Sequence, residues 1–346
     1  MARPSSLAPY GPSPVSSEVG RPSKELPPAI LLMGPTASGK TGVALELVRR
    51  FPAEIISVDS AQVYRHMNIG TAKPDLDTRL RFPHHLIDVI EPNERYSAAR
   101  FRNDAVGIMG DIANDSRIPL LVGGTMLYFK ALREGLSDLP PADPDTRMVL
   151  DVMAAETGWP AMHRELERID PVAAKRLDPN DSQRIQRAME IFYLTGKPMS
   201  ELLAIGRPAD LPYRLIPVAL VPGERRELHA RIASRFEEML ELGLINEVRE
   251  LRENYVLSPD LPSMRCVGYR QVWQYLDGEY TLAGLREKAV SATRQLAKRQ
   301  LTWLRAMPEV KVFDCLDEDL QEQVGRHLEE ALAARITEGS AASLRK

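Results

Sequence analysis

Residues 29–41 read AILLMGPTASGKT, and this stretch decides the fold of the chain. It opens with an apolar run of the length of a buried strand. The part from Gly34 to Thr41 then matches the pattern G-x-x-x-x-G-K-[ST] in full, and residues 40–50 continue as an amphipathic helix. A strand, a glycine-rich turn and a helix in this order predict a phosphate-binding loop. A chance turn rich in Gly and Ser would lack the strand before it and the helix after it.

The chemistry of this turn favours a diphosphate as its ligand. Glycines let the backbone curl so that successive N–H groups point at one anion, and the following helix directs the positive end of its dipole to the same place. Lys40 adds a positive charge, and the hydroxyl of Thr41 is placed to hold Mg²⁺. We therefore expect the whole loop to bind a diphosphate: Gly34, Pro35, Thr36, Ala37, Ser38, Gly39, Lys40 and Thr41.

Apolar segments and helical segments alternate after the loop. Strands are expected at 54–58 and 118–122, a helix at 97–114, and a third apolar segment lies at 86–90. The sheet is expected to resume at 215–221, before long helices at 224–242 and 282–307. Strands that alternate with helices give a parallel sheet. The predicted fold class is therefore α/β, with a P-loop NTPase-like parallel sheet core flanked by helices and a small all-helical insertion domain.

Composition along the chain predicts its domain boundaries. Residues 1–28 are rich in Pro, Ser and Gly and lack periodic apolar residues, so we expect a disordered tail. The core is expected over 29–136 and 212–313, and the helical insertion over 137–211, after a proline-rich linker. Residues 314–346 are expected to form a C-terminal helix and tail.

The ends of two predicted strands bear on function. Asp59 directly follows the strand at 54–58, so it should lie beside the phosphate loop at the carboxyl edge of the sheet. The strand at 118–122 ends in Gly123-Gly124-Thr125. Motor and switch NTPases carry an Asp at such a strand end, where it supports the magnesium site. The difference predicts a site that binds a phosphate group rather than one that transfers a γ-phosphate.

Positive charge is concentrated in the second half of the chain, although the net charge is −3. Two clusters of basic and amide residues lie at 183–187 and 265–270. The third cluster lies on the helix at 282–307 and contains Arg294, Lys298, Arg299 and Arg305, with no acidic residue between positions 291 and 307. Such clusters, with amide and aromatic partners, suit single-stranded loops of RNA. For any one of them, an ordinary solvated face is the alternative.

Two arginines on the helix at 224–242 offer a further anion contact. Arg231 and Arg235 are four residues apart and share a face, so one of them could close over the diphosphate. On spacing alone, a solvated arginine face explains the pair equally well.

The cysteine content and hydropathy indicate the compartment. Cys266 and Cys315 are the two cysteines and lack metal-ligand spacing, which is typical of a reduced cytoplasmic protein. No apolar run is long enough to cross a bilayer, and the N-terminus has no apolar signal core. We expect a cytoplasmic monomer with no membrane partner.

A series of segments resembles, in the same order, those of the tRNA dimethylallyltransferase family. They are GPTASGKT, VDSAQVYR, IGTAKP, LLVGGTMLYFKAL, DPNDSQRIQRAME, LPSMRCVGYRQ and ATRQLAKRQLTWLR. The resemblance covers residues 29 to about 313 and is far more specific than the phosphate loop alone. The chain departs from the family at its N-terminal tail, which the family generally lacks. It also lacks the Cys/His finger of eukaryotic members, which favours a bacterial-type enzyme.

The resemblance implies transfer of a dimethylallyl group from dimethylallyl diphosphate to N6 of the adenosine on the 3′ side of the tRNA anticodon. It implies Mg²⁺ as cofactor, Asp59 as general base, and Thr36, Lys40 and Arg235 as further catalytic residues, with Arg235 on the prenyl diphosphate. The residues that it places toward the anticodon stem-loop are Asp59, Ser60, Ala61, Gln62, Thr125, Arg147, Gln183, Arg184, Ile185, Gln186, Arg187, Arg265, Cys266, Val267, Gly268, Tyr269, Arg270, Lys298, Arg299, Gln300 and Arg305. It also implies that the helical insertion clasps the anticodon stem.

Three other functions remain open at this point. A P-loop nucleotide or small-molecule kinase would consume ATP, but it leaves the basic carboxyl half unexplained. A prenyltransferase for free adenine nucleotides would need no RNA loop. An RNA-binding module with a relic phosphate loop would bind tRNA and modify nothing. Asp59 could likewise be a Mg²⁺ ligand or a loop cap instead of a base.

Overall fold

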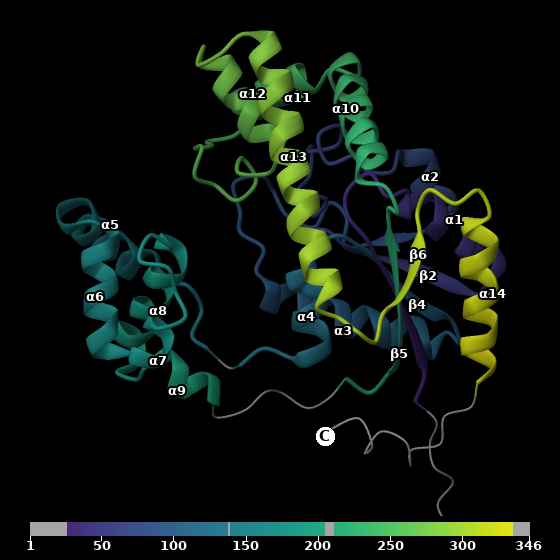
Figure 1. Cartoon of the computed structure of the whole chain (residues 1–346), viewed down its shortest axis with the longest axis horizontal. Coiled ribbons are helices and arrows are strands. Elements are labelled where there is room, and N and C mark those ends of the chain that lie inside the picture. Colours follow the sequence, from purple (N-terminus) through teal and green to yellow (C-terminus); the bar gives the residue numbers. More distant parts are fainter. Residues whose placement is uncertain (1–25, 138, 205–210, 335–346) are drawn as a thin grey trace, which may run out of the picture.

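The chain forms one parallel sheet with helices on both faces (Figure 1). The computed structural model describes residues 26–137, 139–204 and 211–334. Most of the predicted N-terminal tail and the end of the predicted C-terminal tail lie outside these residues. The sheet has six strands in the order β3-β2-β4-β1-β5-β6, and every pair is parallel. The strands are β1 (Pro28–Met33), β2 (Ala53–Val58), β3 (His84–His85), β4 (Ile118–Gly123), β5 (Arg214–Val221) and β6 (Lys311–Asp314). The predicted fold class is confirmed.

Strand β1 lies at the centre of the sheet, and both of its faces are buried. Ile30 and Leu32 pack on the face that α1 (Lys40–Arg50) and α14 (Leu320–Ala333) cover. Leu31 and Met33 pack on the opposite face. Because all four side chains are fully buried, the strand is a continuous apolar run instead of an alternating one.

The first half of the core places its helices between successive strands. Asp75 and Ser97 cap two of them, since their side chains accept hydrogen bonds from Thr78 N and Arg100 N. The helices are α1, then α2 (Leu76–Arg81), α3 (Ala98–Asn114) and α4 (Met126–Glu134). Helices α3 and α4 cover the face of the sheet opposite to α1. They leave the carboxyl ends of β1, β2 and β4 at one edge.

The second half of the core is mostly helical. Its helices are α10 (Arg225–Glu241), α11 (Leu244–Asn254), α12 (Tyr269–Leu276), α13 (Leu282–Arg305) and α14. The 24-residue α13 packs against α10 and α12 and reaches α4 (Figure 1). This helix therefore runs beside the edge where the strands of the first half end.

Between α4 and β5 the described residues form helices only. These are α5 (Pro144–Thr157), α6 (Trp159–Ile169), α7 (Pro171–Ala174), α8 (Ser182–Thr195) and α9 (Met199–Ala204). Asp143, Asp170 and Asp181 cap α5, α7 and α8. The group has an apolar cluster of its own around Leu150, Leu166 and Ile185, and Figure 1 shows it beside the sheet. It lies within the range predicted for the helical insertion.

The sequence did not predict the two short strands at the edges of the sheet, β3 and β6. The apolar segment at 86–90 forms no strand, because Leu86 and Asp88 adopt φ angles of 61° and 56°. Apart from an isolated bridge between Tyr64 and Ile90, the pairing at this edge comes from the two residues of β3 just before the segment. Strand β6 was not predicted. In the described part of the chain, no helix is both long and apolar enough to span a membrane.

Candidate active site

The phosphate loop joins β1 to α1 and is held against the end of β5. Gly39, with φ 80°, is the N-cap of α1, and Lys40 is the first residue of that helix. A Cβ on Gly34 would lie 2.8 Å from the carbonyl oxygen of Leu220, so this position admits only glycine without a backbone shift. The loop therefore has the strand–loop–helix setting that the sequence predicted.

Lys40 is folded into the loop. Its Nζ donates to the carbonyl oxygens of Gly34 and Pro35 at 2.9 and 2.6 Å and to Ser38 Oγ at 3.4 Å. Burial lowers the pKa of Lys40 to about 8, against the opposing effect of Asp59 and with a contribution from Arg235. Because the ammonium group is poorly solvated here, an anion bound in the loop would stabilise its charged form.

Asp59 directly follows β2 and uses its two oxygens differently. Its Oδ1 accepts hydrogen bonds from the backbone N–H groups of Ala61 and Gln62, at 2.8 and 3.4 Å. Within the described residues, Oδ2 has no hydrogen-bond partner. The carboxylate is thus held in place by one oxygen, and the other is open to a substrate.

The residues after β4 fix the loop that carries Asp59. A Cβ on Gly123 would lie 2.0 Å from the carbonyl oxygen of Val58, so the two strand ends approach as closely as a glycine allows. Thr125 Oγ1 accepts from Ser60 N at 3.0 Å and donates to Ser60 Oγ at 3.3 Å. The Thr125 hydroxyl therefore holds Ser60, the residue directly after Asp59, in place.

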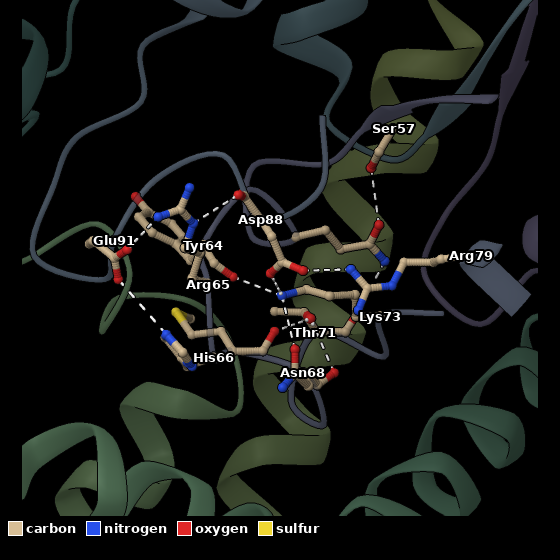
Figure 2. Close-up of polar contacts among 12 residues, drawn as sticks. Ser57, Tyr64, Arg65, His66, Asn68, Thr71, Lys73, Arg79, Asp88 and Glu91 are labelled. Carbon is tan, nitrogen blue, oxygen red and sulfur yellow. Dashed lines mark hydrogen bonds and ion pairs between the residues drawn. The ribbon is translucent and has the colours of Figure 1, made fainter. Parts of the chain in front are cut away.

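A partly buried ion-pair network holds the far part of this loop, as Figure 2 shows. Lys73 Nζ donates to Tyr64 O at 2.8 Å, to Asn68 Oδ1 at 3.1 Å and to Asp88 Oδ1 at 2.7 Å. Arg79 Nη1 donates to the other oxygen of Asp88 at 2.5 Å. Burial raises the pKa of Asp88, but the hydrogen bonds from Lys73 and Arg79 outweigh burial and hold that pKa below its usual value. The Lys73 side chain is only 1% exposed.

Glu247 on α11 binds the turn of the same loop. Its carboxylate accepts from the backbone N–H groups of Asn68, Ile69 and Gly70 at 2.9, 2.8 and 3.2 Å. The hydroxyl of Tyr269 donates to it at 2.5 Å. A Cβ on Gly70 would meet the Tyr269 ring at 2.5 Å, so the turn packs directly on this side chain.

These elements enclose one cavity of about 700 Å³. The phosphate loop, Asp59 and Gln62 line it, and Arg265, Arg299 and the turn at 70–74 also contribute. Apolar side chains from α10 and α13 complete the lining: Ile232, Phe236, Met239 and Leu296. The cavity therefore joins an anion site to an apolar wall.

Two further groups of the lining have shifted pKa values. Burial lowers the pKa of Arg235, and Asp59 opposes this effect. Burial also raises the pKa of Cys266 to about 12, so this thiol stays protonated and unreactive at neutral pH. Of the arginine pair on α10, only Arg235 lines the cavity, whereas Arg231 reaches the carbonyl oxygen of Cys315 at 3.4 Å.

The cavity brings together most of the predicted site residues. From the predicted sets it is lined by Thr36, Ala37, Ser38, Gly39, Lys40, Thr41, Asp59, Ser60, Ala61, Gln62, Arg235, Arg265, Cys266, Val267, Gly268, Arg299 and Gln300. The predicted residues outside its lining are Gly34, Pro35, Thr125, Arg147, Gln183, Arg184, Ile185, Gln186, Arg187, Tyr269, Arg270, Lys298 and Arg305. Among these, Gln183 still reaches the rim, since its amide oxygen accepts from both terminal nitrogens of Arg265 at 2.6 Å.

Burial contradicts direct tRNA contact for two of the predicted residues. Ile185 is 0% exposed and packs in the apolar cluster of α5–α8, and Tyr269 is 0% exposed beneath the Gly70 turn. As direct contacts, these two predictions are wrong, because no part of either side chain can reach a ligand. Both residues support neighbours that are exposed.

Two predicted arginines are already paired with a buried carboxylate. Arg147 and Arg187 donate to Glu190, which is fully buried and also accepts from Asp143 N. Arg187 further donates to Pro140 O at 2.5 Å. The two arginines thus hold the linker before α5, with partly exposed guanidinium groups.

Several lining residues were missed by the sequence prediction. Ile232, Phe236 and Met239 lie on the same face of α10 as Arg235, so helical spacing around that arginine would have found them. Thr71, Ala72 and Pro74 belong to the quoted segment IGTAKP, to which no site role was given. Thr293 and Leu296 likewise belong to the quoted segment ATRQLAKRQLTWLR without a site role, whereas Ser57 and His84 carried no signal of their own.

The site offers few protein oxygens that could bind Mg²⁺. Thr41 is exposed in the cavity that Asp59 also lines. In the described residues, no group of three or more His, Cys, Asp or Glu side chains could hold a metal ion. Mg²⁺ commonly binds through one or two protein groups together with substrate phosphates and water. The donor set therefore suits an ion that arrives with a diphosphate.

Family models match most of the chain. A model described as IPP transferase matches residues 62–307, and one described as Isopentenyl transferase matches residues 28–81. A protein of Nitrosospira multiformis named tRNA dimethylallyltransferase is 62% identical over 302 residues, which are 87% of this chain and 94% of that protein. A protein of Nitrosomonas europaea with the same name is 61% identical over 303 residues, 88% of this chain and 96% of that protein.

Solved structures agree with these matches. The tRNA isopentenylpyrophosphate transferase of Bacillus halodurans has a TM-score of 0.65 and 36% identity, and the likeness covers 88% of this chain and 96% of that one. A eukaryotic dimethylallyltransferase described as acting on tRNA has a TM-score of 0.76 and 26% identity, with 91% and 81% of the two chains covered.

Proposed function

The chain belongs to the IPP transferase family of tRNA dimethylallyltransferases, and from this we propose that it transfers a dimethylallyl group from dimethylallyl diphosphate to N6 of the adenosine on the 3′ side of the tRNA anticodon. One observation carries the proposal. The phosphate loop, the open oxygen of Asp59 and the apolar face of α10 line the same cavity. A prenyl diphosphate and a base that activates its acceptor need this combination.

The anionic end of the donor lies in the phosphate loop in this proposal. The amides of Ala37, Gly39, Lys40 and Thr41 bind the diphosphate, together with the side chains of Lys40 and Arg235, and stabilise the charge that grows as it leaves. Thr41 and the diphosphate oxygens would hold Mg²⁺, which stabilises the charge of the leaving group when bound. Ile232, Phe236 and Met239 pack against the prenyl chain.

Asp59 acts on the acceptor. The lone pair of adenine N6 is delocalised into the ring, so the amine is a weak nucleophile. As N6 forms its bond to C1 of the prenyl group, the C1–O bond breaks and its electron pair leaves with the diphosphate. The proton of N6, now acidic, passes to Asp59 Oδ2. The base must be flipped out of the anticodon loop to reach this point, at a cost of a few kcal/mol.

The tRNA lies over the exposed basic groups in this proposal. Arg265 and Arg299 line the cavity, and Arg294, Lys298 and Arg305 are exposed on α13. Their contacts with phosphates offset the cost of flipping the base. The clasping of the anticodon stem by the predicted helical insertion belongs to the same proposal, as does a monomeric state.

The decisive experiment combines the protein, Mg²⁺, dimethylallyl diphosphate and an anticodon stem-loop, followed by mass spectrometry. We expect one added prenyl unit on the adenosine next to the anticodon. Prenylation of free AMP with an unmodified stem-loop would favour the enzyme for free nucleotides. Phosphate transfer from ATP would favour a kinase, and binding of the stem-loop without any product would favour an RNA-binding module. The relatives named above do not favour these alternatives.

A further inference from the structure

Gln300 connects three elements that meet at the active site. It lies on α13, is 8% exposed, and uses both ends of its amide. Its Oε1 accepts from the backbone N–H of Thr36 in the phosphate loop at 2.9 Å, and its Nε2 donates to the carbonyl oxygen of Gly124 after β4 at 2.8 Å. One side chain therefore joins the loop after β1 to the loop after β4.

The packing around this amide leaves little freedom. A Cβ on Gly124 would lie 2.3 Å from Gln300 Nε2 and 3.2 Å from Gly34 O. The phosphate loop, the loop after β4 and α13 are therefore in direct contact. A buried amide with both groups bonded has one orientation, so it fixes the atoms that it contacts.

The bond from Thr36 also decides which loop amides face a ligand. Because the N–H of Thr36 points to Gln300 and that of Ser38 to the carbonyl oxygen of Pro35, these two are not free for an anion. The amides of Ala37, Gly39, Lys40 and Thr41 remain. The position of α13 therefore defines where in the loop a diphosphate is bound.

The tRNA-facing groups proposed for α13 lie on its other side. At 3.6 residues per turn, Arg294, Lys298 and Arg305 fall within roughly 40° of one another and about opposite Gln300. These three side chains are exposed, whereas Gln300 is buried. The two faces of one helix therefore serve different substrates.

We propose that Gln300 is a positioning residue for the diphosphate loop and makes no contact with tRNA. This inference rests on the proposed function, because it assigns Gln300 to the donor side of that reaction. It replaces the expectation that Gln300 binds RNA. Gln300 acts through Thr36 and Gly124, and its loss should change donor binding before any other property.

The test is a double-mutant cycle with Gln300→Ala and Gly124→Ala. The first removes the amide, and the second pushes it aside from the opposite direction. Binding of inorganic diphosphate is measured by calorimetry, and binding of an anticodon stem-loop by fluorescence anisotropy. Each single variant should bind diphosphate roughly tenfold more weakly, the factor for about one lost hydrogen bond. In assays of prenyl transfer, the KM for the donor should rise while the affinity for the stem-loop stays unchanged.

The double variant should be no worse than either single one, because the severe clash of a Cβ at Gly124 is with Gln300 Nε2, and the contact with Gly34 O that remains, at 3.2 Å, is much milder. Gln321→Ala at an exposed position of α14 is the matched control and should bind both ligands as the wild type does. Thermal melts of all variants separate a positioning effect from a loss of folding.

Two results would overturn the inference alone. One is a wild-type diphosphate affinity in Gln300→Ala together with weaker binding of the stem-loop. The other is a double variant whose fold-loss of diphosphate affinity equals the product of the fold-losses of the two single variants. If the wild-type protein binds no diphosphate, the proposed function fails and this inference fails with it.

Discussion

Asp59 is anchored through Oδ1 by the backbone of residues 61 and 62. An anchored carboxylate can present its second oxygen to a substrate without losing conformational freedom at the moment of reaction. The loop-cap role and the general-base role, which are alternatives in the sequence, are therefore compatible in the structure. The cap uses Oδ1, and the proposed base would use Oδ2 of the same side chain.

Replacing Asp59 by Asn tests the base directly. Asn keeps the shape and can still accept from Ala61 N, but it cannot take a proton at neutral pH. We expect kcat to fall by roughly 10²–10⁴-fold, the usual contribution of a positioned base, while both substrates still bind. Single-turnover kinetics with tRNA affinity measured in parallel gives both quantities. A wild-type rate would remove Asp59 from the chemistry.

The competing role as a Mg²⁺ ligand predicts a different response of the same variant. If Asp59 held the metal, donor affinity would fall, and added Mg²⁺ would recover much of the rate. Repeating the kinetics across a magnesium series separates the two roles, and near-complete rescue would contradict the base assignment.

Lys40 predicts a pH dependence of donor binding. Its pKa in the free protein is lowered to about 8 by burial, so the side chain loses its charge as the pH rises above that value. A bound diphosphate favours the charged form, and binding above this pH must take up a proton. The affinity for inorganic diphosphate should then fall up to about tenfold per pH unit. Calorimetry in buffers of different ionisation enthalpy measures the proton uptake.

Lys40→Ala provides the control for this titration. The variant should bind diphosphate weakly, with no such dependence on pH, and should bind tRNA as the wild type does. If the wild-type affinity is flat from neutral pH upward while the variant binds weakly, the lysine is charged throughout and the lowered pKa is contradicted.

The sequence could predict individual residues only where neighbours in the chain determine their surroundings. The glycines and Lys40 of the phosphate loop are of this kind, because the loop is built from consecutive residues. Tyr269 and Gln300 are not, since their burial depends on Gly70 and Gly124, which are far away in the chain. A motif identifies which residues are present, but it does not show which of their side chains distant parts of the chain will bury.

Among the elements, the loop between β2 and β3 depends most on distant partners. Lys73, Asp88 and Glu247 hold it from two sides, through ion pairs and through backbone amides. This loop carries Asp59 at one end and lines the cavity at the other. These contacts therefore help to fix the position of Asp59, which the proposed function makes the base.

The ion pair between Lys73 and Asp88 predicts unequal effects of removing its two members. Asp88→Asn leaves the buried ammonium of Lys73 without a carboxylate, and we expect the free energy of unfolding to fall by about 3 kcal/mol. Lys73→Met removes that buried charge and leaves Asp88 paired with Arg79, so its loss should be smaller. Urea unfolding at neutral pH measures both. If both variants lose the same free energy of unfolding, the unpaired buried charge of Lys73 is not the cause of the destabilisation in Asp88→Asn.

The strands and helices with strong periodicity were predictable, and the short ones were not. Strands β1, β2, β4 and β5 are apolar runs long enough to recognise. Strand β6 has four residues, and its pairing comes from β5, so its own letters carry little signal. Helix α11 was not predicted either, although its buried Leu244, Val248 and Leu251 follow helical spacing.

Over the whole molecule, the distribution of charge matters more than the net value. The chain carries a net charge of −3, but α13 presents Arg294, Lys298 and Arg305 on one exposed face. Replacing Arg294 or Lys298 by Ala should weaken tRNA binding and lower the salt dependence by up to about one unit of slope per lost phosphate contact. Titrations of a stem-loop over a range of salt concentrations give the slope. An unchanged slope would mean that this face is merely solvated.

The sequence predicted that the region of α5–α9 is helical, but it did not predict the contacts between these helices and the core. The proline-rich linker and the helical segments after it predicted these elements. The group contacts the cavity rim through the hydrogen bonds between Gln183 and Arg265. The linker before α5 is held by the buried Glu190, which accepts from Asp143 N. Such contacts join residues that no periodicity connects. The domain boundaries themselves stay a prediction.

The order of the strands determines how the chain can fold as it leaves the ribosome. β1 emerges first, but its neighbours are β4 and β5, and β5 begins only at Arg214. Throughout the synthesis of α5–α9, β1 has at most one partner, and its apolar edge is open to other chains. The helices made in this interval depend on local contacts and can form quickly. Nascent chains that already contain β4 but not yet β5 are thus the stage most in need of chaperones.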